Sequence, residues 1–145
     1  MQKKKVLCVC AGNTCRSPMM AALLQKLLGD EYLVESAGIR VETARPANAH
    51  SILCMKEREI DLSGHRSRWI GDTNISQFSH FVCVHENVED VVRRVARING
   101  AMFLTANKDC GGIPDPYGKG LPAYRECLDL LDKVLPDIAK QIRGC

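Results

Sequence analysis

The chain has 145 residues, of which 46% are hydrophobic and 26% charged, and its formal net charge is +3. This composition is ordinary for a globular domain and argues against a disordered chain or a strongly basic nucleic-acid-binding protein. No apolar run reaches the length of a transmembrane helix, and the one near the N-terminus is too short for a signal peptide. We therefore expect one domain over residues 1–145, in the cytoplasm, without a membrane or nucleic-acid partner.

The eight cysteines show neither the Cys-x2-Cys pairs nor the His/Cys spacing of a zinc site. They also lack the pattern of a disulfide-stabilised secreted domain. We expect most of them to be reduced thiols in a cytosolic protein, and we expect no metal and no other cofactor.

Short apolar runs alternate with helical patterns along the chain. In chain order, the predicted elements are a strand at 6–10, a helix at 17–28, a strand at 32–34, a helix at 49–59, a strand at 81–84, a helix at 86–98, a strand at 101–104 and a last helix from residue 122. This alternation predicts an α/β fold with a parallel sheet covered by helices on both faces. Ligands bind such sheets at the carboxyl ends of the strands.

The last helix follows a long loop rich in Gly and Pro, at residues 105–121, of the kind that often carries function. Its expected apolar stripe consists of Tyr124, Leu128, Leu131, Leu135, Ile138 and Ile142. Pro136 lies within this helix and predicts a kink or a division in two.

The most informative stretch follows the first strand, where residues 10–17 read Cys-Ala-Gly-Asn-Thr-Cys-Arg-Ser. A tight loop between a strand and a helix start points successive N–H groups inward, and the helix N-terminus adds partial positive charge. A phosphate dianion fits such a loop. The residues expected to form this phosphate-binding loop are Ala11, Gly12, Asn13, Thr14, Cys15 and Ser17.

Two side chains of this loop predict phosphoryl transfer to a cysteine. Cys10 is the expected nucleophile, held as a thiolate by the amides and by Arg16. Arg16 is the expected clamp on two phosphate oxygens. Gly12 would let the backbone approach the phosphate closely. Ser17 is expected to cap the helix, with Pro18 at its first position, and to donate its hydroxyl to the thiolate.

A carboxylate in the late loop is a candidate general acid. Departure of a leaving group from phosphorus requires a proton, and Asp115 lies in the sequence Ile-Pro-Asp-Pro-Tyr. An Asp before Pro is also a common turn pair, so the residues alone leave a rigid turn as an equal alternative.

The wider sequence resembles the low-molecular-weight protein tyrosine phosphatase family. The matching pieces are Val-Cys-Ala-Gly-Asn-Thr-Cys-Arg-Ser-Pro-Met at 9–19, Ser-Ala-Gly at 36–38, His-Arg-Ser-Arg at 65–68 and Asp-Pro-Tyr at 115–117. The resemblance implies a three-layer α/β/α fold with a four-stranded parallel sheet, phosphotyrosine phosphatase I-like. It also implies a metal-free, two-step phosphatase that acts on phosphorylated proteins, and we favour a monomer.

The resemblance assigns further roles by position. Asp115 becomes the general acid, and Tyr117 a wall of the substrate pocket. Ser36 and His65 are implied to support the loop, and Asn13 to hold its shape. Cys15 is implied to form a reversible disulfide with the nucleophile, which would protect it from irreversible oxidation.

Two positions leave the substrate open. Tyrosine-specific members usually have Ile at the place of Thr14, and often a second aromatic at the place of Gly118. Protein arginine phosphatases, a branch of the same family, usually have Thr at the first place and an aromatic followed by Gly after Asp-Pro, as in Tyr117-Gly118. A threonine hydroxyl can orient water or meet a polar guanidinium. Residues 39–44 also lack an aromatic, which predicts weaker ring stacking. We expect phosphotyrosine as the substrate, with phosphoarginine as the alternative.

Two other functions are less favoured. A thioredoxin-coupled arsenate reductase needs a relay of cysteines, but Cys83 has no close partner in sequence and Cys110 is remote. A non-catalytic phosphate-binding module would lack the nucleophile, the arginine or the acid, and all three are present. We assign no role to His50, His80 and His85, which belong to no motif. Trp69 is expected to be a packing residue.

Overall fold

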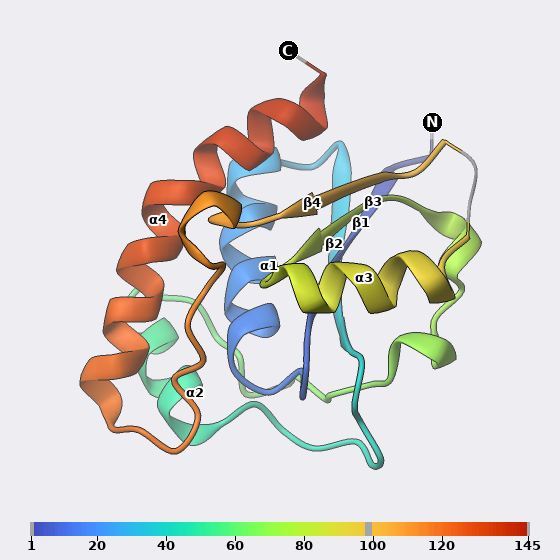
Figure 1. The fold of residues 1–145 in the computed structure, drawn as a ribbon. Coiled ribbons are helices and arrows are strands. Elements are labelled where there is room, and N and C mark those ends of the chain that lie inside the picture. Colours follow the sequence, from blue (N-terminus) through green and yellow to red (C-terminus); the bar gives the residue numbers. More distant parts are fainter. Residues whose placement is uncertain (1, 98–99, 145) are drawn as a thin grey trace.

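A computed structural model describes residues 2–97 and 100–144. In chain order its strands and α-helices are β1 (Lys4–Cys10), α1 (Arg16–Leu28), β2 (Tyr32–Gly38), α2 (Ala49–Lys56), β3 (Phe78–Cys83), α3 (Glu86–Val95), β4 (Met102–Thr105) and α4 (Leu121–Arg143) (Figure 1). Short 3-10 helices lie at η1 (Ile70–Asp72), η2 (Ile75–Gln77) and η3 (Lys108–Cys110).

The four strands form one parallel sheet in the order β2-β1-β3-β4. Residues 6–10 of β1 are buried, as expected for a central strand covered on both faces. Helix α1 packs on β1 and β2, and α3 packs on β3 and β4. Figure 1 shows α1 and α4 on one side of the sheet and α3 on the other. The predicted three-layer α/β/α fold is therefore confirmed.

This strand order places a ligand site at the end of β1. The chain leaves β1 toward β2 on one side and later returns to β3 on the other. Connections diverge at such a switch point and leave a crevice at the carboxyl end of the strand. The loop at residues 10–16 (the Cys10 loop) begins there.

Some predicted boundaries differ from the structure. Helix α2 ends at Lys56 rather than at residue 59, where Glu59 adopts a left-handed φ of 63° that cannot continue a helix. Helix α3 ends at Val95, and its predicted end at Ile98 falls outside the described residues.

The predicted division of the last helix is wrong. Helix α4 runs through Pro136 as one element, and every residue of the predicted apolar stripe is buried. Pro136 lies on the exposed face, so the carbonyl that loses its N–H partner there is available to water. Packing of the stripe on both sides of Pro136 keeps α4 a single helix, and a kink at Pro136 remains a prediction. In the described part of the chain, no helix is long and apolar enough to cross a membrane.

Candidate active site

The Cys10 thiol lies at the end of β1 and is only 3% exposed. Its Sγ is 2.9 Å from the hydroxyl of Ser17 and accepts a hydrogen bond from the N–H of Asn13 at 3.2 Å. The Asn13 N–H thus donates to the sulfur, and the Ser17 hydroxyl can donate to it once Sγ is a thiolate. This arrangement stabilises negative charge on Sγ, as a nucleophilic thiol requires.

The expected capping role of Ser17 is not found. Helix α1 begins at Arg16, so Cys15 is the N-cap and no side chain caps the helix. The Ser17 hydroxyl is occupied elsewhere, because it contacts Cys10 and accepts from Asn13 Nδ2 at 2.8 Å. Pro18 therefore lies in the third helical position instead of the first.

The helix N-terminus is consequently open to an anion. Among the backbone hydrogen bonds of the described residues, the N–H groups of Gly12, Thr14 and Cys15 donate to no carbonyl. Uncapped N–H groups at a helix start are a ready binding site for phosphate. An added Cβ at Gly12 would meet only Thr14 Oγ1, at 3.9 Å, so the protein itself leaves room there. The need for glycine at this position remains a prediction about the phosphate complex.

Asn13 holds the Cys10 loop in shape from inside the protein. Its side chain is fully buried, and its backbone adopts a left-handed φ of 57° that Asn tolerates better than most residues. Nδ2 donates to Ser17 and to the hydroxyl of Ser36 at 3.0 Å, and Oδ1 accepts from the N–H of Arg68 at 3.0 Å. All hydrogen-bonding groups of the side chain are thus used.

His65 contacts the same loop. Its Nε2 lies 2.7 Å from the carbonyl oxygen of Asn13, and since a carbonyl only accepts, Nε2 carries the proton. Burial lowers the pKa of His65, so the ring is held neutral. The structure therefore brings Ser36 and His65 together on Asn13.

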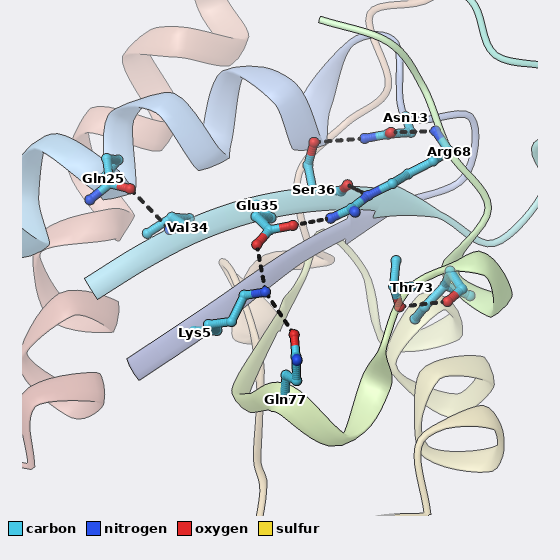
Figure 2. A network of polar contacts seen from close by, with 10 residues as sticks. Lys5, Asn13, Gln25, Val34, Glu35, Ser36, Arg68, Thr73 and Gln77 are labelled. Carbon is cyan, nitrogen blue, oxygen red and sulfur yellow. Dashed lines mark hydrogen bonds and ion pairs between the residues drawn. The ribbon is translucent and has the colours of Figure 1, made fainter. Parts of the chain in front are cut away.

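A row of ion-paired side chains connects these supports of the Cys10 loop to the first residues of β1 (Figure 2). Arg68 donates through Nε to the carbonyl of Ser36 and pairs with Glu35 at 2.6 Å. Glu35 also pairs with Lys5 at 3.1 Å. Burial opposes the charge of Glu35, but these hydrogen-bonded cations outweigh it and lower its pKa. Sequence inspection did not single out Glu35 or the side chain of Arg68.

Gly38, in the matching Ser-Ala-Gly piece, lies directly against the Cys10 loop. A Cβ there would lie 2.5 Å from the carbonyl oxygen of Ala11 and 2.7 Å from Val41 Cγ2. The backbone after Gly38 bonds directly to the Cys10 loop, with Ile39 N–H donating to the carbonyl of Cys10 at 3.0 Å. Only glycine permits this close approach.

The late loop brings Asp115 to Arg16. One guanidinium nitrogen of Arg16 donates to the carbonyl of Ile113 at 2.9 Å, and another lies 3.6 Å from Asp115 Oδ2. Ile113 in turn donates its N–H to the carbonyl of Val84 at 2.7 Å, which ties the loop to the end of β3. The Asp115 side chain is 52% exposed, and Oδ1 accepts from the N–H of Tyr117. Its carboxylate is therefore accessible to a ligand.

These groups line one cavity of about 680 Å³. The predicted residues on its wall are Cys10, Gly12, Asn13, Thr14, Cys15, Arg16, Asp115 and Tyr117. The sequence analysis missed several more, among them Arg40, Arg45 and Trp69. Trp69 is not a simple packing residue, because it is 45% exposed on this wall. Its position one residue after the His-Arg-Ser-Arg motif was the available signal.

Cys15 contacts helix α4 through its thiol. The Cys15 thiol is buried, lies 3.3 Å from the hydroxyl of Tyr124, and has its pKa raised by burial. Cys10 and Cys15 are both free thiols here, so their pairing remains a prediction.

His85 caps α3, where Nδ1 accepts from the N–H of Asn87. Over residues 2–97 and 100–144, no cluster of His, Cys, Asp and Glu could hold a metal ion.

Known proteins resemble this chain over nearly its whole length. Residues 5–144 match the family described as "Low molecular weight phosphotyrosine protein phosphatase". The protein-arginine-phosphatase of Geobacillus stearothermophilus is 31% identical over 144 residues, covering 96% of each chain. The probable low molecular weight protein-tyrosine-phosphatase EpsP of Ralstonia nicotianae is 30% identical over 143 residues, covering 97% of each.

A solved structure agrees with this relation. Vibrio vulnificus Wzb in complex with benzylphosphonate has a TM-score of 0.84 and 30% identity, and the match covers 97% of this chain and 99% of that one. Arsenate reductases of Staphylococcus haemolyticus are also among the relatives, at 29% and 36% identity. The relatives therefore carry three different activity names.

Proposed function

This chain belongs to the low molecular weight phosphotyrosine protein phosphatase family, and we propose that it hydrolyses phosphotyrosine in proteins through a phosphocysteine at Cys10. The observation that carries the proposal is the geometry around the thiol. A buried Cys10 Sγ faces two hydrogen-bond donors beneath an uncapped helix N-terminus, in one cavity with Arg16 and Asp115.

The first step transfers the phosphoryl group to sulfur. The Cys10 thiolate attacks phosphorus, and the bond from phosphorus to the phenolic oxygen breaks. Asp115, in its acid form, gives its proton to that oxygen as tyrosine leaves. Arg16 and the free N–H groups of the Cys10 loop stabilise the charge on the phosphoryl oxygens. The 3.6 Å contact of Arg16 with Asp115 keeps the acid beside the anion site.

The second step restores the thiol. A water molecule attacks phosphorus and gives a proton to the Asp115 carboxylate. The bond from phosphorus to sulfur breaks, inorganic phosphate leaves, and Cys10 is again a thiolate, held by Ser17. In this proposal Ser36 and His65 act only through Asn13, and Cys15 protects Cys10 by a reversible disulfide.

Aromatic side chains at the cavity favour tyrosine. Tyr117 lines the cavity and is 68% exposed, so its ring is available to a substrate ring. The Vibrio vulnificus relative was solved with benzylphosphonate, a ligand that combines a ring with a phosphonate.

Protein arginine phosphatase is the second candidate, and Thr14 favours it. Its side chain is partly exposed on the cavity wall, where a hydroxyl can face a guanidinium or a water molecule. Its Oγ1 makes only a long contact of 3.8 Å to Cys15 Sγ, so it is free to turn toward a ligand.

The other two candidates receive less support. A reductase relay needs an accessible second thiol close to Cys10. Cys83 is fully buried, and burial raises its pKa well above the usual value, while the exposed Cys110 does not line the cavity of Cys10. A non-catalytic module is disfavoured because nucleophile, arginine and acid meet in one cavity. We further propose a cytoplasmic monomer without a cofactor, acting on phosphorylated proteins.

Initial rates on a phosphotyrosine peptide and a phosphoarginine protein test the proposal, under reducing conditions with EDTA. Cys10→Ala should abolish both. Faster tyrosine turnover supports the proposal, and faster arginine turnover supports the second candidate. Asp115→Asn should slow the release of tyrosine by about 10²–10⁴-fold and the first-turnover release of 4-nitrophenol far less, because 4-nitrophenol leaves without a proton.

A further inference from the structure

Exposed aromatic side chains gather at one place on this molecule. Among the described residues, the exposed large hydrophobic side chains are Leu27, Leu33, Leu53, Trp69, Val95, Met102 and Tyr117. Only Trp69 and Tyr117 in this set are aromatic, and only these two line the cavity that contains Cys10. The aliphatic members all lie outside it. An exposed tryptophan on the wall of a cavity that also holds Cys10 and Arg16 is suited to contact a ligand.

The backbone of Trp69 is fixed relative to the Cys10 loop. Trp69 pairs with Gly38 in an isolated parallel bridge, and the preceding residue, Arg68, accepts the N–H of Gly38 at 2.9 Å and donates to Asn13. On its other side, the Trp69 carbonyl accepts the N–H of Asp72 at 2.9 Å, which starts η1. Its position therefore follows that of the loop.

Gly71 leaves space for the indole. A Cβ on Gly71 would lie 2.4 Å from Trp69 Cζ3, 2.5 Å from Cη2 and 2.7 Å from Cε3. The six-membered ring thus packs directly on the backbone of Gly71. Because this contact orients the ring before a ligand arrives, little side-chain entropy remains to be lost on binding.

We infer that Trp69 is a substrate-contacting residue whose indole stacks on the aromatic ring that carries the phosphoryl group. The inference rests on the proposed function, since it assigns a specificity residue to the Cys10 site. Stacking of this kind strengthens binding of an aryl phosphate and does nothing for a phosphoryl donor without a ring. Trp69 thereby supplies the ring contact that residues 39–44 lack.

Three substrates separate the possible roles of Trp69: a phosphotyrosine peptide, 4-nitrophenyl phosphate and acetyl phosphate, which has no ring. For Trp69→Ala we expect KM to rise about five- to tenfold for both aryl substrates, with kcat little changed and acetyl phosphate unaffected. Trp69→Phe should recover most of the loss. Met102→Ala, which truncates an exposed apolar side chain outside the cavity, should change none of the three.

Gly71→Ala tests the geometry without removing the ring. The new Cβ must displace the indole, which is the far end of a side chain, so the protein should fold normally and KM for aryl substrates should rise. In a Trp69→Ala background the same change should add nothing. Gly64→Ala is the matched control, since its Cβ would meet nothing within 4 Å.

Fluorescence gives a direct readout, because Trp69 is the single tryptophan of the chain. In Cys10→Ala, the phosphotyrosine peptide should change the Trp69 emission far more than inorganic phosphate does. Equal losses on all three substrates, a loss confined to the peptide, or an unchanged emission on peptide binding would each overturn the inference. Absence of phosphatase activity in the wild-type protein would instead overturn the proposed function.

Discussion

Asn13→Ala should separate the stability of the Cys10 loop from its chemistry. The substitution removes hydrogen bonds to Ser17, Ser36 and Arg68, of 2.8, 3.0 and 3.0 Å, from a fully buried position. At about 1 kcal/mol each, these contribute about 3 kcal/mol. Alanine at a φ of 57° costs about 1 kcal/mol more. We therefore expect the free energy of unfolding to fall by about 4 kcal/mol.

Chemical denaturation followed by circular dichroism measures this change, with Asn13→Gly as the matched variant. The glycine variant loses the same hydrogen bonds, but glycine tolerates the left-handed backbone. Its free energy of unfolding should therefore be about 1 kcal/mol higher than that of the alanine variant. Competitive inhibition by inorganic phosphate should weaken about tenfold in both, because the N–H groups are no longer pre-oriented. If the free energy of unfolding of Asn13→Ala lay within about 1 kcal/mol of the wild-type value, the supporting role of Asn13 would be refuted.

Three further predictions follow from single contacts. Gly38→Ala should cost about 1–3 kcal/mol of stability and most of the activity because its Cβ overlaps the Cys10 loop, whereas Gly64→Ala should be neutral in the same melting and rate assays. Burial lowers the pKa of His65, so its contribution to stability is complete above the unfolded pKa of about 6.5 and declines as pH falls toward the lower folded value. Denaturation across this range should show a smaller decline for His65→Gln, which keeps a donor for Asn13; an unchanged slope would contradict the assignment. Ser51 has a buried hydroxyl without a partner among the described residues, so Ser51→Ala should raise the unfolding free energy by about 1 kcal/mol, and a lower melting temperature would show that the hydroxyl is satisfied.

Local features of the sequence were sufficient for much of the site. The Cys10 loop could be predicted because strand, glycine turn and helix start are consecutive in the chain. The buried stripe of α4 could be predicted because helical periodicity is local. Asp115 needed the family resemblance, since its approach to Arg16 depends on how residues 105–121 fold back onto the end of β3.

Contacts between distant segments could not be predicted in the same way. Ser17 was expected to cap α1, but its hydroxyl is taken by Cys10 and Asn13. Trp69 was expected to be a packing residue. The sequence could not show that its ring lies beside the cavity, in the space that Gly71 leaves. Pro136 was expected to kink α4 or divide it in two, and the division is absent because residues on both sides of the proline are buried against the rest of the protein.

The most direct test of the central claim is to locate the phosphoryl group during turnover. Asp115→Asn should be mixed with 4-nitrophenyl phosphate, quenched rapidly and digested for mass spectrometry. Because 4-nitrophenol leaves without an acid while water attack still needs the base, the intermediate should accumulate. The account predicts one phosphoryl group on the peptide that contains Cys10. A phosphoryl group on another residue, or undiminished turnover by Cys10→Ala, would contradict it.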